Sequence, residues 1–211
     1  ASAPKPGSPV VRLAKACTTM ETKPFKAHLT KPVREMFDTL GRHSTFIYKM
    51  IFSNLWLFKP VLDMLCKKQG GELNALMRTT VAFTQMQGSD APNVIPPKAE
   101  IISNMRLNPN DTVDSAVEYL RKTVADPNVE INAIMGINPS RISVTDCEGY
   151  NKIAAAISST WKGSLVSPYL MVQCSDSRHY GKISDKVYRF SAMDLTSEER
   201  ATIHGHNERI R

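Results

Sequence analysis

The sequence predicts an α+β fold: a ferredoxin-like unit that lacks its first strand, followed by the last part of an α/β unit. The first observation is the order of elements over residues 1–137. Helix, strand, strand, helix and strand follow one another, which is the βαββαβ pattern without its opening strand. The second observation is a change of character near residue 141, where a helix, a short apolar strand and polar clusters follow.

The ferredoxin-like unit begins with a helix predicted over residues 9–21. Ser8 is the expected N-cap, and Pro9 takes the first helical position, where its missing N–H is not needed. Apolar residues then recur at helical spacing: Val10, Leu13, Ala14, Cys17 and Met20. We therefore expect a helix with one apolar face.

A helical insertion over about residues 22–76 separates this helix from the first strand. Its most apolar stretch, residues 46–66, has apolar side chains at spacings of three and four but is interrupted by Lys49, Lys59 and Pro60. These interruptions argue against a membrane span, which needs about 20 apolar residues. We expect an amphipathic helix, kinked near Pro60, that packs in the core. A substrate channel or a dimer surface is the alternative.

Two strands are predicted over residues 78–86 and 99–107. The first segment is rich in β-branched residues. In the second, alternate residues from Ala99 to Leu107 are mostly apolar and share one face, whereas Asn104 and Arg106 share the other. Arg106 is therefore expected to point away from the core and not to be buried under the helices.

A further helix is predicted from Asp111 to about residue 124, with Asp111 as its acidic N-cap. The alternating segment 129–135 follows as the third strand. In a ferredoxin-like sheet the absent first strand is an interior one, so its omission would leave unpaired strand edges. We therefore expect that the chain lacks an N-terminal part, and that its sheet has an edge beside residues 98–107 or 129–135 that is either exposed or paired with another chain.

The remainder of the chain is predicted to be the end of an α/β unit. A helix is expected over about residues 150–161, and the nearly continuous apolar run 169–174 is typical of a buried strand. Polar residues 175–180 follow this strand at its carboxyl end, where open α/β sheets usually bind ligands. We divide the chain at this change of character, into residues 1–137 and 138–211.

Composition narrows the function classes only weakly. The net charge is +7, but the basic residues are scattered and are not interleaved with aromatic residues that could stack on bases. Nucleic-acid binding is therefore a weak alternative, and an anionic substrate such as a free carboxylate fits the charge equally well. The four cysteines show no C-x-x-C spacing, so neither a zinc knuckle nor a dense disulfide framework is indicated. Cys17 and Cys174 lie in apolar surroundings and are expected in the core.

Short motifs recur in a fixed order along the chain: Asn93-Val-Ile-Pro96, Arg106, Ser175-Asp-Ser-Arg178 and His204-Gly-His-Asn-Glu208. This set resembles the di-zinc aminoacylases and carboxypeptidases of peptidase family M20. Three further segments are similar to the branch of carboxypeptidase S and the N-acyl-amino-acid hydrolases: Ser53–Pro60, Ala75–Thr80 and Tyr188-Arg-Phe190. The resemblance covers nearly the whole chain.

The resemblance implies a hydrolase that cleaves amide bonds of N-acyl amino acids or of peptides with a free C-terminal carboxylate. In that family two zinc ions polarise the carbonyl and activate water, and a glutamate is the general base. His204 matches the last zinc ligand, whereas the glutamate and most other ligands precede the point matching Ala1. We therefore expect no catalytic base in this chain, which alone should be inactive. His206 departs from the family pattern and is expected to be exposed or to lie behind the ligand.

The resemblance also assigns substrate contacts. Arg178 matches an arginine whose guanidinium can hold a carboxylate through two parallel hydrogen bonds, with a salt bridge to Asp176 or Asp185 as the structural alternative. Asn93 and Arg106 match the substrate-facing pair of the family's lid, which reaches the active site of the partner subunit in a homodimer. Without the resemblance, Asn93 would be a turn residue and Arg106 a solvated side chain.

Residues 1–137 would then be the lid, or dimerisation, domain, and residues 138–211 the C-terminal segment of an α/β zinc-peptidase catalytic domain. The competing hypothesis is a non-catalytic dimerisation or regulatory module with the same fold.

Overall fold

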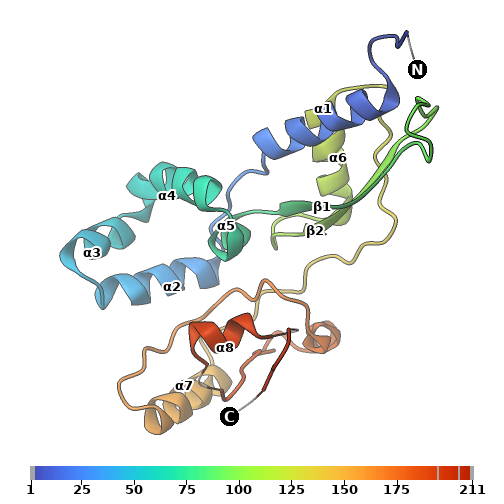
Figure 1. Cartoon of the computed structure of the whole chain (residues 1–211). Coiled ribbons are helices and arrows are strands. Elements are labelled where there is room, and N and C mark those ends of the chain that lie inside the picture. The colour runs from blue at the N-terminus through green and yellow to red at the C-terminus, as the bar shows by residue number, and fades with distance from the viewer. Residues whose placement is uncertain (1–2, 194, 204, 210–211) are drawn as a thin grey trace.

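The computed structural model describes residues 3–193, 195–203 and 205–209. In chain order its elements are α1 (Pro9–Thr22), α2 (Lys31–Arg42), α3 (Phe46–Ser53), α4 (Leu55–Gln69), α5 (Gly71–Met77), β1 (Thr80–Gln87), β2 (Glu100–Arg106), α6 (Val113–Val124), α7 (Glu148–Thr160), the 3-10 helix η1 (Asp176–Lys182) and α8 (Ser197–Ala201). Figure 1 shows three groups. We call them the α/β group (residues 3–25 and 79–137), the helical group (26–78) and the C-terminal segment (the described part of 138–209).

The α/β group is built on the antiparallel hairpin of β1 and β2. Thr80 lies opposite Arg106, and Gln87 lies opposite Glu100 at the other end. The hairpin packs against α1 and α6 through one apolar cluster: Phe25, Ala116, Leu120, Met20, Val81, Met105, Leu107, Tyr119 and Ile131. The predicted helices and the two predicted strands of this group are confirmed to within two residues at most of their ends.

The caps of these helices differ from the sequence prediction. Ser8 is at the N-cap of α1, but its side chain makes no capping hydrogen bond. Thr112, and not Asp111, caps α6, because its hydroxyl accepts a hydrogen bond from the Ser115 N–H at 3.1 Å. The Asp111 carboxylate instead accepts a hydrogen bond from the Thr79 hydroxyl at 2.5 Å. A contact with a residue far away in the chain therefore removes Asp111 from the cap.

The strands predicted over 129–135 and 169–174 are absent, so the prediction was wrong for both segments. A strand needs a neighbouring backbone to accept and donate its hydrogen bonds. In the first segment the Arg121 guanidinium, and not another strand, binds the Ile131 carbonyl, at 2.9 Å from Nε. In the second, Leu170 and Val172 pack their side chains against the helical group. Within the described residues the sheet has two strands, and neither outer edge has a strand partner.

The helical group confirms the predicted helical insertion, but the break lies elsewhere than predicted. The chain leaves the helical conformation at Asn54, between α3 and α4, and Pro60 lies inside α4. The Asn54 side chain donates to the Met50 carbonyl at 2.9 Å, and its backbone carbonyl accepts from the N–H of Phe58. Asparagine thus ends one helix and begins the next by competing for backbone hydrogen bonds. Among the helices that the structure describes, none is both long and apolar enough to cross a membrane.

The helical group has its own apolar core. Two buried clusters share partly buried neighbours, including Phe52 and Leu55, and so form one continuous core: Val33, Met36, Phe37, Leu62, Cys66, Leu76 and Met77. Leu170 and Val172 of the C-terminal segment pack against this core, and hydrogen bonds from Thr145 to Glu35 and from Tyr169 to Glu72 also join that segment to the helical group. The Phe37 and Phe52 rings stack with their centroids 5.1 Å apart.

The close approach of α2 and α3 makes Gly41 a sensitive position. A Cβ at residue 41 would lie 2.7 Å from the Cβ of Phe52, which belongs to the backbone frame of α3 and cannot rotate away. We expect Gly41→Ala to lower the free energy of unfolding by about 1–3 kcal/mol, as overpacking does. Urea denaturation measures this change. The control is Gly149→Ala in α7, where the nearest atom is 3.7 Å away; equal effects of the two substitutions would contradict the steric account.

Candidate functional site

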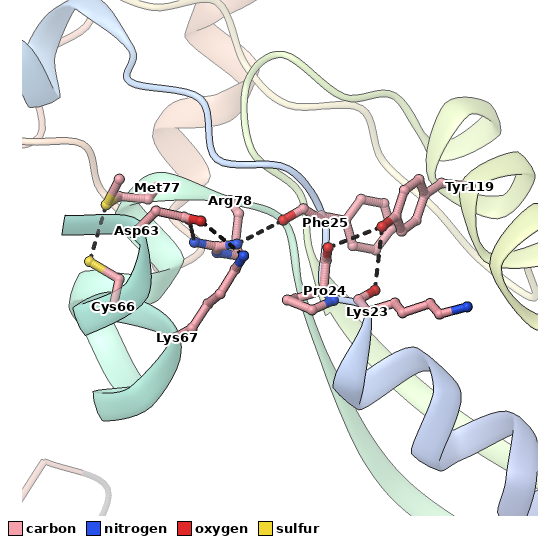
Figure 2. Close-up of polar contacts among 9 residues, drawn as sticks. All are labelled: Lys23, Pro24, Phe25, Asp63, Cys66, Lys67, Met77, Arg78 and Tyr119. Carbon is pink, nitrogen blue, oxygen red and sulfur yellow. Dashed lines mark hydrogen bonds and ion pairs between the residues drawn. The ribbon is translucent and has the colours of Figure 1, made fainter. Parts of the chain in front are cut away.

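Arg78 joins the helical group to the α/β group and is only 1% exposed. Figure 2 shows its guanidinium donating to the Phe25 carbonyl, at 2.9 Å, and pairing with the Asp63 carboxylate of α4. Lys67 lies 2.9 Å from the other oxygen of that carboxylate. Partial burial alone would raise the pKa of Asp63, but the hydrogen bonds and positive charges of Lys67 and Arg78 outweigh it and lower that pKa.

Further contacts hold the hairpin beside this junction. The Phe25 ring packs on the Tyr119 ring of α6, with centroids 4.3 Å apart, and the Tyr119 hydroxyl donates to the Pro24 carbonyl at 3.0 Å (Figure 2). Thr79, directly before β1, accepts a hydrogen bond at its hydroxyl from the Asn108 N–H at 2.8 Å. Asn108 follows β2 by two residues. These contacts therefore fix the end of the hairpin that carries Arg106.

Arg106 extends from this fixed end toward the C-terminal segment. Its neighbours on β2 confirm the predicted alternation, since Met105 packs in the α/β cluster while Asn104 is exposed. The Arg106 guanidinium lies 3.0 Å from the Cys174 sulfur, and it is not buried under the helices. Cys174 is exposed, so the expectation that it belongs to the core was wrong. Because no strand forms over 169–174, the end of that run is open to Arg106.

The segment that follows Cys174 forms the turn that carries Arg178. The Ser175 hydroxyl accepts from the Ser177 N–H at 3.3 Å, and the Ser175 carbonyl accepts from the Arg178 N–H at 3.1 Å, which closes the first turn of η1. Arg178 is half-buried, and its Nε lies 3.4 Å from a ring nitrogen of His179. In the part of the chain that the structure describes, Arg178 forms no ion pair with Asp176 or Asp185.

Arg189 is a third arginine at this turn. Its Nε donates to the Ser177 hydroxyl at 2.5 Å. We assigned it no role from the sequence, although it lies in the Tyr188-Arg-Phe190 segment that resembles the family. Arg106 thus contacts Cys174, Arg189 contacts Ser177, and Arg178 is the residue after Ser177. Among the described residues none of these three arginines is paired with a carboxylate. We call this set the arginine cluster.

The structure does not bring Asn93 to the arginine cluster. Asn93 is an exposed residue in the loop between β1 and β2, beyond the Gln87–Glu100 pair. Arg106 is at the opposite end of the hairpin. The seven residues from Glu100 to Arg106 alone span about 20 Å of strand. Within one chain, the two residues predicted to act as a substrate-facing pair are therefore separated.

The predicted zinc ligand, His204, lies outside the described residues. His206, two positions on, is exposed. Over residues 3–193, 195–203 and 205–209, no group of three or more His, Cys, Asp or Glu side chains is arranged to hold a metal ion. The described side chains therefore do not by themselves fit a metal centre.

Comparison with known proteins places the chain in a family. Residues 1–132 match the peptidase dimerisation domain of the M20 peptidases. This chain belongs to the M20 peptidase family. Membership implies a metal-dependent peptidase or hydrolase in general terms, in line with the expectation drawn from the motifs.

Several M20 relatives resemble nearly the whole chain. It is 31% identical over 210 residues to the probable carboxypeptidase S-like 2 of Dictyostelium discoideum, covering 99% of this chain and 40% of that protein. It is 35% identical over 180 residues to the N-fatty-acyl-amino acid synthase/hydrolase PM20D1 of Xenopus tropicalis, covering 85% and 35%. The mouse protein of that name is 30% identical over 213 residues. The chain thus spans about 40% of the length of these relatives. No solved structure matches it.

Proposed function

We propose that this M20 chain is the lid and C-terminal segment of a zinc-dependent hydrolase that cleaves amide bonds of N-acyl amino acids or of peptides with a free C-terminal carboxylate. The arginine cluster is the observation that carries the proposal. The relatives named carboxypeptidase and N-fatty-acyl-amino acid synthase/hydrolase support it, because both names refer to molecules that bear a free amino-acid carboxylate.

The arginine cluster has the chemistry that a carboxylate requires. A guanidinium presents a planar fork that can donate two parallel hydrogen bonds to a carboxylate, and it keeps its charge at all physiological pH values. In this arrangement Arg178 would clamp the substrate carboxylate and Arg106 would add a second positive charge from the lid. Arg189 would be a positioning residue, since it holds Ser177 in the turn that presents Arg178.

Zinc and its ligand His204 belong to this proposal through the family motif. A neutral histidine nitrogen is a suitable zinc donor, and bound zinc would supply the polarised carbonyl and the activated water. Because the described side chains hold no complete ligand set, we assign no other ligand in this chain and no reaction step to the metal. The general base and the remaining ligands are proposed to come from another part of the full-length enzyme, so this chain alone should be inactive.

We also propose the division of labour within the chain. Residues 1–137, with the helical insertion 22–76, would form the lid through which a homodimer assembles, in keeping with the dimerisation-domain match over 1–132. Residues 138–211 would complete the catalytic domain. Asn93, at the exposed hairpin loop, would then face the active site of the partner subunit. The alternative, a non-catalytic dimerisation module, predicts that the full-length protein contains no bound zinc, which metal analysis would reveal.

Arg178→Lys in the full-length enzyme tests the clamp. Lysine keeps the charge but loses the two-pronged geometry, so we expect KM to rise or kcat/KM to fall by about tenfold or more. Steady-state kinetics on an N-acyl amino acid measures the change, and the zinc content should stay normal. Arg42→Lys is the matched control, because Arg42 is an exposed arginine paired with Asp38 far from the cluster. Kinetics equal to those of the unmodified enzyme would refute the assignment of Arg178.

A further inference from the structure

Helices α3 and α4 expose an unusual amount of apolar surface. Nine large apolar side chains within residues 46–65 are at least two-fifths exposed: Phe46, Ile47, Tyr48, Met50, Trp56, Leu57, Val61, Met64 and Leu65. Phe46 is 80% exposed and Trp56 is 79% exposed. Isolated exposed apolar residues are normal on a protein surface, but a contiguous run of this kind marks an interaction site.

The exposed side chains follow from helices that are apolar on two sides. On α4, Leu62 and Cys66 are buried in the core of the helical group. Leu57, Val61 and Met64 are spaced by four and three residues and lie on the opposite side of the helix. A helix that is apolar all round is normally buried on all sides. The core of this chain therefore accounts for one side of α4, and the other needs a further apolar partner.

The charges around this surface are almost entirely positive. Residues 43–69 contain four lysines and one acid, Asp63, which is engaged by Arg78 and Lys67. Lys49 and Lys68 are exposed, and no carboxylate in the described part of the chain pairs with them. Lys68 follows Val61 and Met64 by seven and four residues and so lies on the outer side of α4, whereas Lys59 shares the side of Leu62 and Cys66. An apolar helical surface with lysines beside it, and with tryptophan and tyrosine among its exposed residues, is typical of helices that lie in a membrane interface.

We propose that α3 and α4 form a docking surface for a bilayer that contains anionic phospholipids. The apolar side chains would enter the boundary between headgroups and acyl chains, while the long lysine side chains reach the phosphates. A second copy of the chain fits this surface less well, because a symmetric contact would bring the unpaired lysines of both copies together. Figure 1 places α3 and α4 at the opposite end of the molecule from the loop between β1 and β2.

Vesicle sedimentation with the whole 211-residue chain tests the proposal. Vesicles of phosphatidylcholine and phosphatidylserine should bind the chain, and added salt should weaken the binding, because the lysine attraction is screened. The triple variant Leu57→Gln, Val61→Gln, Met64→Gln should lose the binding. The variant Lys49→Gln, Lys68→Gln should weaken it by about fivefold per lysine. The control Ile134→Gln, Met135→Gln alters equally exposed apolar residues elsewhere, at 82% and 88%, and should bind normally.

A site-specific signal comes from Trp56. The chain has two tryptophans, so in a Trp161→Phe background only Trp56 emits. Its emission should shift to shorter wavelength with anionic vesicles. The proposal is overturned if anionic vesicles neither sediment the chain nor shift the Trp56 emission. It is equally overturned if vesicles of phosphatidylcholine alone bind the chain as well as the anionic vesicles do. It is also overturned if the apolar triple variant instead converts a dimer to a monomer without changing vesicle binding, since the surface would then join two copies.

Discussion

His204→Ala in the full-length enzyme should remove bound zinc and lower the turnover by more than about 100-fold. Substitutions behind a metal ligand already cost about 10–100-fold in affinity or activity, so the loss of a ligand itself should cost more. One ligand among three or four sets both the retention of the ion and the acidity of its bound water. Metal analysis of the purified variant and steady-state kinetics with an N-acyl amino acid measure the two effects together.

His206→Ala is the matched control for this prediction. His206 is exposed, lies two residues from His204 and departs from the family motif. Its removal should leave zinc content and turnover unchanged. If the His204 variant retained full metal and activity, or if His206→Ala lost both while His204→Ala did not, the ligand assignment would have to be abandoned.

Arg78→Ala should lower the free energy of unfolding by about 3 kcal/mol, the lower end of the range for breaking a buried ion pair. The lower end applies because Asp63 is a quarter exposed and retains Lys67 as a partner. The substitution also leaves the Phe25 carbonyl without its donor and opens a cavity between the helical and α/β groups. Urea denaturation followed by circular dichroism measures the loss. Lys67→Ala, which removes the more exposed partner of the same carboxylate, should cost less than about 1 kcal/mol.

The same pair should make stability depend on pH. Because the pKa of Asp63 is lower in the folded chain than in the unfolded chain, its stabilising effect is complete above the unfolded value, about 3.9, and is lost as the pH falls through the folded value. Between about pH 6 and pH 3 the free energy of unfolding should therefore fall less steeply with decreasing pH for Arg78→Ala than for the unmodified chain. Urea denaturation at a series of pH values measures it. Parallel curves would show that Asp63 is not held by Arg78.

The elements that the sequence predicted well are those specified by neighbouring residues. Pro9 and the apolar stripe behind it set α1, and the alternation along residues 99–107 set β2 and the direction of Arg106. The helical insertion was predictable for the same reason. The position of the break within the insertion was not predictable. Pro60 is the residue that usually signals a kink, but the break is at Asn54, whose hydrogen bond to the Met50 carbonyl depends on the local backbone path.

What the sequence by itself determined is α1, α6, α7, the helical nature of the insertion, the two strands and, through ordered short motifs, membership of the M20 family. Only the tertiary structure decided which segments become strands, since an apolar run such as 169–174 needs a partner backbone that no local pattern supplies. It also decided that Arg78 is buried against Asp63, that Arg106 meets Cys174, and that Arg189 joins the turn of Arg178. These contacts link residues 12 to 68 positions apart, and the direction of a side chain over such separations follows from packing rather than from its neighbours in the chain.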